Sequence, residues 1–277
     1  GNKTEYTYNF NNDVTQIKYP DIAFEFKAYD MMGRLIIAYD RNFDSTRYTY
    51  DKNGRVIDEK RNMIYNSNGQ TKKYYDKNSN LIKESVKNNE QGDTSEATFV
   101  TTEYVYNNAN NLIGTKVNDG SRTSAVQYWY DKADRITAMA TGLSSINTGS
   151  TSPSSGYITR YEYNTRGYLS KETDALGQST SYTHDFVGNV KTATDRNGAV
   201  TTNEYGPYGV TSTNITDGTS TEQYVYTYNR MGMLTSTKLY NNGTLKDTVT
   251  STYDSFGREL SKTSNGKTNK YSYDPNS

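Results

Sequence analysis

The chain has 277 residues, with 31 Lys and Arg, 31 Asp and Glu, and a formal net charge of zero. This balance lacks the basic surface typical of a nucleic-acid-binding protein, so we expect no nucleic-acid partner. The sequence has no cysteine, which excludes disulfides and thiolate metal sites. It also has no apolar run near the ~20 residues of a membrane-spanning helix, so we expect no membrane insertion.

The composition predicts an ordered β-protein. Only 32% of the residues are hydrophobic, but 28 Tyr, 7 Phe and 1 Trp are present. Disordered chains are poor in aromatic residues. No long stretch has the three- and four-residue apolar spacing of an amphipathic helix. We therefore predict thin β-structure in which half-buried rings take the place of a thick aliphatic core.

One pattern recurs from one end of the chain to the other. It consists of Tyr-x-Tyr, then Asp or Asn, two variable residues, Gly or a substitute, and an aliphatic residue. The second aromatic position falls at 8, 29, 50, 75, 106, 130, 163, 184, 205, 228, 253 and 273. A recurring period is typical of repeat architectures, so we predict a single array of about 12 units over residues 1–277, with the first and last units partial.

Each unit predicts a β-hairpin. The two tyrosines share one face of a strand because they are two positions apart. Asp or Asn then bonds to backbone amides of a tight turn, and Gly supplies the permissive backbone after it. Arg-Leu, or an equivalent pair, then starts the returning strand. The residues assigned to this structural motif are Tyr29, Asp30, Gly33, Tyr50, Asp51, Gly54, Tyr75, Asp76, Tyr130, Asp131, Tyr163, Gly167, His184, Asp185, Gly188, Tyr228, Gly232, Tyr253, Asp254 and Gly257.

Second turns and insertions complete the units. Turn sequences at 174–177, 195–198 and 264–266 indicate that a unit has two strands and two turns. Polar insertions at 87–99 and 141–157 read as surface loops, and the second is rich in Ser, Gly and Thr and is expected to be mobile. Substitutes for the turn glycine suit the same turn chemistry. They are Asn12, Ser79, Asn110 and Asp134.

The repeat resembles that of a known family. The stretches "AYDMMGRL" (28–35), "YTYDKNGRV" (48–56) and "TYDSFGREL" (252–260) are similar to the Tyr-Asp repeat of the Rhs, or rearrangement hot spot, proteins. That family includes bacterial polymorphic toxins, wall-associated proteins of Gram-positive bacteria, the C components of insecticidal toxin complexes and animal teneurins. The resemblance covers essentially the whole chain.

The resemblance implies an all-β fold class, in which tandem hairpins form a continuous spiralling antiparallel sheet and part of a hollow shell. It also implies a secreted or bacterial cell-surface location. The implied partners are the remaining repeats and a C-terminal effector domain of a longer protein. Toxin members carry an Asp-Pro-x-Gly-Leu type motif for aspartyl self-cleavage, which does not follow "YDPNS" (273–277) here. We therefore transfer no protease or toxin residues, and we expect the chain to be an excised fragment.

His184 is the only histidine and has two interpretations. With Asp185 and either Ser179 or Ser181 it would form a catalytic triad. Alternatively, it occupies the tyrosine position of one repeat, and Asp185 belongs to the following turn. We favour the second interpretation, because successive residues of a strand face opposite sides and are poorly placed for a proton relay.

Metal binding and catalysis have weak signals. Asp76, Asn78 and Asn80 alternate as in the start of a calcium loop, but Leu81 and Lys87 stand where an EF-hand needs Gly and Glu. No pair of acids stands out for glycoside cleavage. We therefore expect no metal, no cofactor and no enzymatic activity.

Trp129 is the single candidate for ligand binding. It lies between two tyrosines, so it points to the opposite face, where most units place a polar residue. There it would stack on a sugar ring or contact a partner. The alternative that we favour is packing against a neighbouring long side chain or under the 141–157 loop.

The sequence thus predicts a non-enzymatic structural segment of a large Rhs-type protein, which forms part of a β-shell around an effector domain. The alternative is a cell-surface adhesion or carbohydrate-binding module that contacts surface glycans or proteins. An enzyme with its site in an insertion or between distant repeats is a third class.

Overall fold

The computed structural model describes residues 3–62, 68–89 and 99–274. The chain divides into two compact units, Gly1–Ile158 and Thr159–Ser277, which are described separately below. The elements in the described ranges are β-strands joined by turns and one longer loop, which confirms the predicted all-β class. No helix in these ranges is long and apolar enough to cross a membrane.

The first unit is a run of antiparallel hairpins. Its strands are β1 (Glu5–Tyr8), β2 (Val14–Lys18), β3 (Phe24–Tyr29), β4 (Leu35–Tyr39), β5 (Ser45–Tyr50), β6 (Val56–Asn62), β7 (Asn68–Tyr75), β8 (Leu81–Asn89), β9 (Val100–Tyr106), β10 (Leu112–Asn118), β11 (Thr123–Tyr130) and β12 (Ile136–Leu143). From β1 to β12, consecutive strands pair antiparallel. β13 (Tyr157–Tyr163) begins at the end of this unit.

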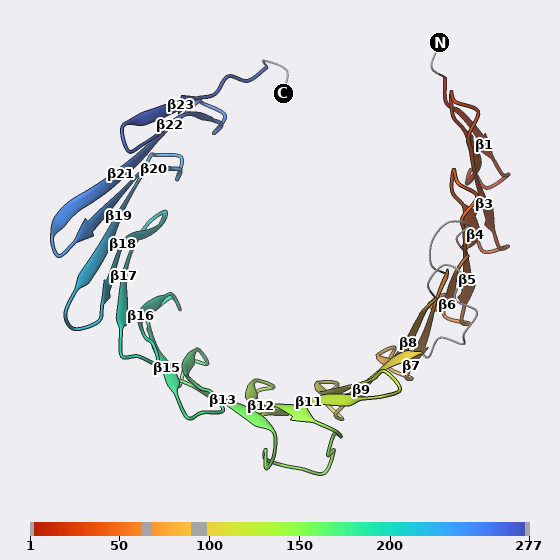
Figure 1. Cartoon of the computed structure of the whole chain (residues 1–277), viewed down its shortest axis with the longest axis horizontal. Helices are drawn as coiled ribbons and strands as arrows, with labels where there is room; N and C mark the ends of the chain where they lie inside the picture. Colours follow the sequence, from red (N-terminus) through yellow and green to blue (C-terminus); the bar gives the residue numbers. More distant parts are fainter. Residues whose placement is uncertain (1–2, 63–67, 90–98, 275–277) are drawn as a thin grey trace. The chain divides into compact units, whose positions relative to one another are not determined.

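The second unit continues the same arrangement. Its further strands are β14 (Leu169–Thr173), β15 (Ser179–His184), β16 (Val190–Thr194), β17 (Val200–Gly206), β18 (Gly209–Thr216), β19 (Thr221–Tyr228), β20 (Leu234–Asn241), β21 (Thr244–Tyr253), β22 (Glu259–Ser264) and β23 (Lys267–Lys270). From β13 to β23, consecutive strands again pair antiparallel. Figure 1 shows the strands of each unit following one another in chain order. The predicted antiparallel sheet of hairpins is confirmed.

The Tyr-Asp motif forms the turn that follows an odd-numbered strand, and we call this side of the sheet the motif edge. At Asp51, the backbone N–H donates to the carbonyl of Arg55 at 2.9 Å, and Gly54 N–H donates back to the Asp51 carbonyl at 3.0 Å. The Asp51 Oδ1 atom accepts from the amides of Asn53 and Arg55 at 2.8 and 3.0 Å. Gly54 has a φ of +81°, as the motif predicted.

The same turn recurs with other residues in the glycine position. Asn12, Ser79, Asn110 and Asp134 have φ values of 67, 69, 69 and 58°. Short polar side chains tolerate this left-handed conformation better than most. The substitutions that the sequence analysis singled out therefore preserve the turn.

The opposite edge of the sheet uses this turn as well. The turns at Asp174 and Asp195 were predicted, and both form the same pair of backbone hydrogen bonds. A further turn at Asp40 was missed, although it follows Tyr39 and has the same geometry. Its fourth residue, Phe43, adopts a φ of 63° without being glycine. The sequence analysis missed this turn because its search followed the Tyr-x-Tyr pattern. That pattern precedes only the turns of the motif edge.

The insertion after β12 packs on the sheet. Among the described residues, the buried hydrophobic side chains are Ala125, Ala138 and Ala140, on β11 and β12. Gln127, on the same face, donates Nε2 to the Asn147 carbonyl at 2.7 Å and accepts from the Asn147 amide at 2.9 Å. The loop expected to be mobile over 141–157 is therefore anchored to the sheet. Its ends lie within β12 and β13.

The other predicted insertion lies mostly outside the described residues. Positions 90–98 are not described, and Lys87–Asn89 belong to strand β8 and not to a loop.

The turn carboxylates make the fold sensitive to acid. The side chain of Arg34, then its backbone amide, lower the pKa of Asp30, and hydrogen bonds led by the Asn189 side chain lower that of Asp185. A carboxyl whose pKa is depressed by folding stabilises the fold above its unfolded pKa, near 4, and loses this contribution as pH falls through its folded pKa.

We expect the free energy of unfolding to decline below about pH 4, because the unfolded chain binds protons there more readily than the turn carboxylates of the folded protein do. Urea unfolding between pH 2 and 7 measures the decline. Asp185→Asn should flatten it, and Asn229→Asp, at an equivalent turn that already has Asn, should steepen it. Identical pH profiles for the two variants would contradict this account.

Candidate functional site

The most regular feature of the structure is the joint between successive hairpins. Backbone pairing between neighbouring hairpins stops before the motif edge: the last β4–β5 pair is Ile37 with Arg47. Beyond it, the Tyr50 hydroxyl donates to the carbonyl of Leu35 at 2.7 Å. The side chain thus supplies the hydrogen bond that the backbone of β5 does not provide.

We call this hydrogen bond a tyrosine bridge. It runs from the second tyrosine of one motif to the first residue of the returning strand in the preceding hairpin, or to the second residue in the case of Val210 on β18. The bridges are Tyr29 to Val14 (3.1 Å), Tyr50 to Leu35 (2.7 Å), Tyr75 to Val56 (3.5 Å), Tyr106 to Leu81 (3.2 Å), Tyr130 to Leu112 (2.7 Å), Tyr205 to Val190 (2.8 Å), Tyr228 to Val210 (2.9 Å), Tyr253 to Leu234 (2.8 Å) and Tyr273 to Glu259 (2.8 Å).

Burial favours the protonated form of two bridging tyrosines. Burial raises the pKa of Tyr29 and of Tyr130 above the ordinary value, with a smaller contribution from a neighbouring charged or phenolic group. A tyrosine donates only in its protonated form, whose ordinary pKa is about 10. The bridges of Tyr29 and Tyr130 therefore keep their donors throughout the physiological pH range.

An arginine covers several of these tyrosines. Arg34 binds the carboxylate of its own turn, with Nε 2.7 Å and Nη2 2.6 Å from Asp30 Oδ2. Its guanidinium also lies over the ring of Tyr50, 4.6 Å from the centroid. One side chain thus joins the turn of its own hairpin to the bridging tyrosine of the next. We call this contact the arginine clamp; Arg55 and Arg258 repeat it over Tyr75 and Tyr273.

The sequence analysis missed this role. Its signal was present, because an arginine directly follows the turn glycine in "DMMGR", "DKNGR" and "DSFGR". That arginine was read only as the start of the returning strand.

His184 lies at the end of β15, in the position of a bridging tyrosine. Its ring stacks on Tyr168, with centroids 5.1 Å apart and the planes tilted by 28°. Tyr168 holds the position that arginine takes in a clamp. A Cβ atom on Gly188 would lie 2.7 Å from the Tyr168 ring, so glycine is required there for the stack as well as for its φ of +100°. Two aromatic rings thus replace the clamp and its tyrosine.

The groups of the proposed triad serve other contacts: Asp185 bonds to its turn, and the two serines are paired within the sheet. Asp185 Oδ1 accepts from three turn amides at 2.9 Å, and its Oδ2 accepts from Asn189 Nδ2 at 2.9 Å. Ser181 is paired in the sheet with Thr194 and Lys171, and Ser179 with Thr173. The buried Nδ1 of His184 has no hydrogen-bond partner among the described residues. The geometry offers no proton relay from His184.

The candidate calcium residues also serve a turn. Asp76 Oδ1 accepts from the Asn80 amide at 2.8 Å, and Oδ2 from Asn80 Nδ2 at 2.9 Å. The described part of the chain contains no cluster of three or more His, Cys, Asp or Glu side chains placed to hold a metal ion.

Trp129 lies against the insertion that follows β12. Its indole N–H donates to the Ser150 carbonyl at 3.1 Å. Together with Gln127 and the serines of the loop, it lines a small polar hollow of about 230 Å³. The indole edge is thus used inside the protein, and its use for an external ligand stays a prediction.

The remaining motif residues lie where the repeat places them. Tyr163, Tyr228 and Tyr253 end strands β13, β19 and β21. Gly33, Gly167, Gly232 and Gly257 have positive φ values of 77, 89, 78 and 87°. Asp131 and Asp254 accept turn amides as Asp51 does.

A comparison with solved structures identifies the fold. The structure called TcdB2-TccC3-TEV matches 98% of this chain with a TM-score of 0.67 and 14% sequence identity. The fold is that of TcdB2-TccC3. Two further structures of TcdB2-TccC3, one of them with Cdc42, match 96% and 91% of the chain at 13% identity, with TM-scores of 0.32 and 0.41. No protein-family model and no curated protein matches the sequence.

The chain spans only 15% of the length of the matched TcdB2-TccC3-TEV chain. The likeness to TcdB2-TccC3 therefore concerns a hairpin segment of a much longer polypeptide. It agrees with the Rhs-type repeat recognised in the sequence.

Restoring the bridge at position 184 should stabilise the second unit. In His184→Tyr, the new hydroxyl is placed to donate to the Leu169 carbonyl, which corresponds to the acceptors of the other bridges. We expect a gain of about 1 kcal/mol in the free energy of unfolding, the typical net value of a hydrogen bond. Tyr253→Phe, which removes an existing bridge, should lose a similar amount. Urea denaturation measures both, and a destabilised His184→Tyr would contradict the assignment.

Removing the indole should release the insertion. Trp129→Ala deletes the bond to Ser150 and the ring beneath the loop, so we expect faster cleavage within residues 144–156 in limited proteolysis. Thr227→Ala alters the equivalent position between two tyrosines of another hairpin and should leave cleavage unchanged. Equal cleavage of the loop in Trp129→Ala and the unsubstituted protein would show that the indole does not anchor it.

Proposed function

We propose that the chain is a non-enzymatic wall segment of a large secreted or cell-surface Rhs-type protein. In this proposal the hairpins continue into further repeats and form part of a spiralling shell. The shell encloses or displays an effector domain that lies outside the segment. The observation that carries the proposal is the repetition of one joint, the tyrosine bridge, between successive hairpins over both units.

Repeated joints suit a scaffold. Each hairpin contacts the hairpins before and after it, so the sheet can be extended by adding units without redesigning a common core. Nearest-neighbour contacts then supply the stability of a wall of any length. The fold match to TcdB2-TccC3-TEV, a chain several times longer, supports an origin in such an extended array.

An adhesion or carbohydrate-binding module is the alternative. Its candidate residue, Trp129, donates its indole N–H to Ser150, which leaves that donor unavailable to a sugar. This observation favours the scaffold.

Limited proteolysis of the complete gene product tests the proposal. We expect the region that follows residue 277 to be protected in the unsubstituted protein. Protection should fall in the double variant Tyr50→Phe/Tyr253→Phe, which removes two bridges of 2.7 and 2.8 Å. Tyr74→Phe is the control, because Tyr74 is 47% exposed and forms no bridge among the described residues.

Mass spectrometry of the fragments gives the readout. Equally rapid digestion of the downstream region in all three proteins would refute enclosure by this wall.

A further inference from the structure

One joint of the first unit is looser than the others. The Tyr75 hydroxyl lies 3.5 Å from the Val56 carbonyl, whereas the other bridges measure 2.7 to 3.2 Å. The arginine clamp at this joint is also incomplete. Arg34 Nη1 donates to the Asp51 carbonyl of the next hairpin at 3.4 Å, but the buried Nη1 of Arg55 has no partner among the described residues.

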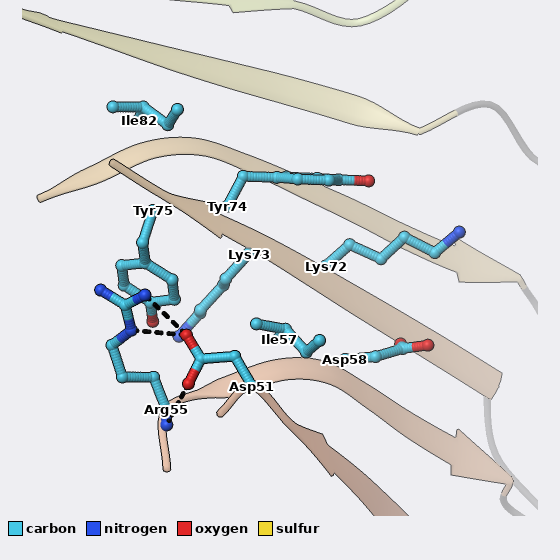
Figure 2. Close-up of a pocket in the computed structure, with 9 residues that line it drawn as sticks. All are labelled: Asp51, Arg55, Ile57, Asp58, Lys72, Lys73, Tyr74, Tyr75 and Ile82. Carbon is cyan, nitrogen blue, oxygen red and sulfur yellow. Dashed lines mark hydrogen bonds and ion pairs between the residues drawn. The ribbon is translucent and has the colours of Figure 1, made fainter. Parts of the chain in front are cut away.

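A hollow of about 530 Å³ opens at the same joint. Figure 2 shows Arg55 and its partner Asp51 beside the ring of Tyr75, with Ile57 of β6 and Lys73 of β7 close to Asp51. Asp58 of β6 and Lys72 and Tyr74 of β7 extend away from Arg55. Ile82 of β8 completes the lining. The volume falls within the range of about 300–1,000 Å³ that is typical of small-molecule sites.

The two carboxylates of the hollow are already paired. Asp51 Oδ2 accepts from Arg55 Nε at 2.7 Å, and Arg55 Nη2 lies 2.6 Å from it. The Asp58 oxygens accept from Gln70 Nε2 at 2.8 and 3.0 Å. Three cations, Arg55, Lys72 and Lys73, against these two anions leave the lining with one net positive charge.

The lysines are held less firmly than the carboxylates. Lys73 Nζ is 3.6 Å from Glu84, which is longer than a charge-assisted hydrogen bond. Lys72 Nζ lies 5.1 Å from the centroid of the Phe99 ring. Both ammonium groups keep donors that a ligand can use.

We propose that this hollow binds a small organic carboxylate. The ligand carboxylate accepts a hydrogen bond from Lys73, and it is attracted by the charge of the Arg55 guanidinium, whose buried Nη1 lacks the carbonyl partner that Arg34 Nη1 has. Its apolar body lies against Ile57, Tyr75 and Ile82. One negative charge matches the net charge of the lining. This proposal does not depend on the role of the chain as a wall segment.

Benzoate is the probe, and ligand-observed NMR titration with the whole chain is the measurement. We expect saturable binding of benzoate. Benzamide, which has the same shape without the charge, should bind at least about tenfold more weakly because a charge-assisted hydrogen bond is lost. Phenyl phosphate, a dianion, should bind no tighter than benzoate.

Variants locate the site. Arg55→Gln should weaken benzoate binding about tenfold or more. The matched control is Arg34→Gln, which removes a clamp whose Nη1 is already paired. This control should bind benzoate as the unsubstituted protein does. Lys73→Met leaves both clamps in place and should also weaken binding, which keeps the test available if Arg55→Gln does not fold.

Several results would overturn the proposal. They are the absence of saturable benzoate binding, equal binding of benzamide, tighter binding of phenyl phosphate, equal effects of Arg55→Gln and Arg34→Gln, and unchanged binding in Lys73→Met.

Discussion

The structure depends on how one hairpin is joined to the next at the edge where the Tyr-Asp turns lie. Neighbouring hairpins separate there, so a carbonyl at the start of a returning strand lies beyond the reach of the adjacent backbone. A carbonyl left without a donor and away from water is costly. The hydroxyl of the next tyrosine reaches it, as in the pair Tyr50 and Leu35. Tyrosine suits this position because its ring fills the gap between hairpins and its hydroxyl supplies the donor.

The bridge also explains why such a polar chain folds. Among the described residues, the buried hydrophobic side chains are three alanines beneath the insertion. Burial in a common core therefore supplies little of the stability. Most hairpins instead gain a bridge, and several joints also have an arginine that links its own turn to the next tyrosine. Contacts of this kind act between nearest neighbours, as in other repeat proteins.

Among the joints described above, those at His184 and Arg55 depart from the rule. At His184, a stack of two rings replaces the clamp and its tyrosine, and the adjacent aspartate that suggested catalysis serves the turn. At Arg55 the joint is stretched, a buried donor is unpaired and a hollow opens. Both departures are recognised only by comparison with the regular joints. Taken singly, the same residues resemble catalytic or structural groups found in many proteins.

Sequence and structure contributed different parts of this picture. The position of His184 in the repeat could be predicted, because a period of about 21 residues sets which residues are equivalent. The turn at Asp40 could not be found in the same way, because its tyrosine and aspartate lie on the opposite edge and fall between the periodic positions. The partner of each tyrosine hydroxyl was also not predictable, since a strand pattern specifies faces and turns but not the distance between separate hairpins.

By itself, the sequence determined the all-β class, the hairpin unit and the residues of its turns. These follow from local rules: alternation along a strand, capping of amides by Asp or Asn, and positive φ at the fourth position. Only the tertiary structure decided which carbonyl each tyrosine reaches, that Arg34 covers Tyr50, that the loop after β12 is anchored by Gln127, and that a hollow opens beside Arg55. Those outcomes depend on how far adjacent hairpins separate, and that separation arises when they pack together.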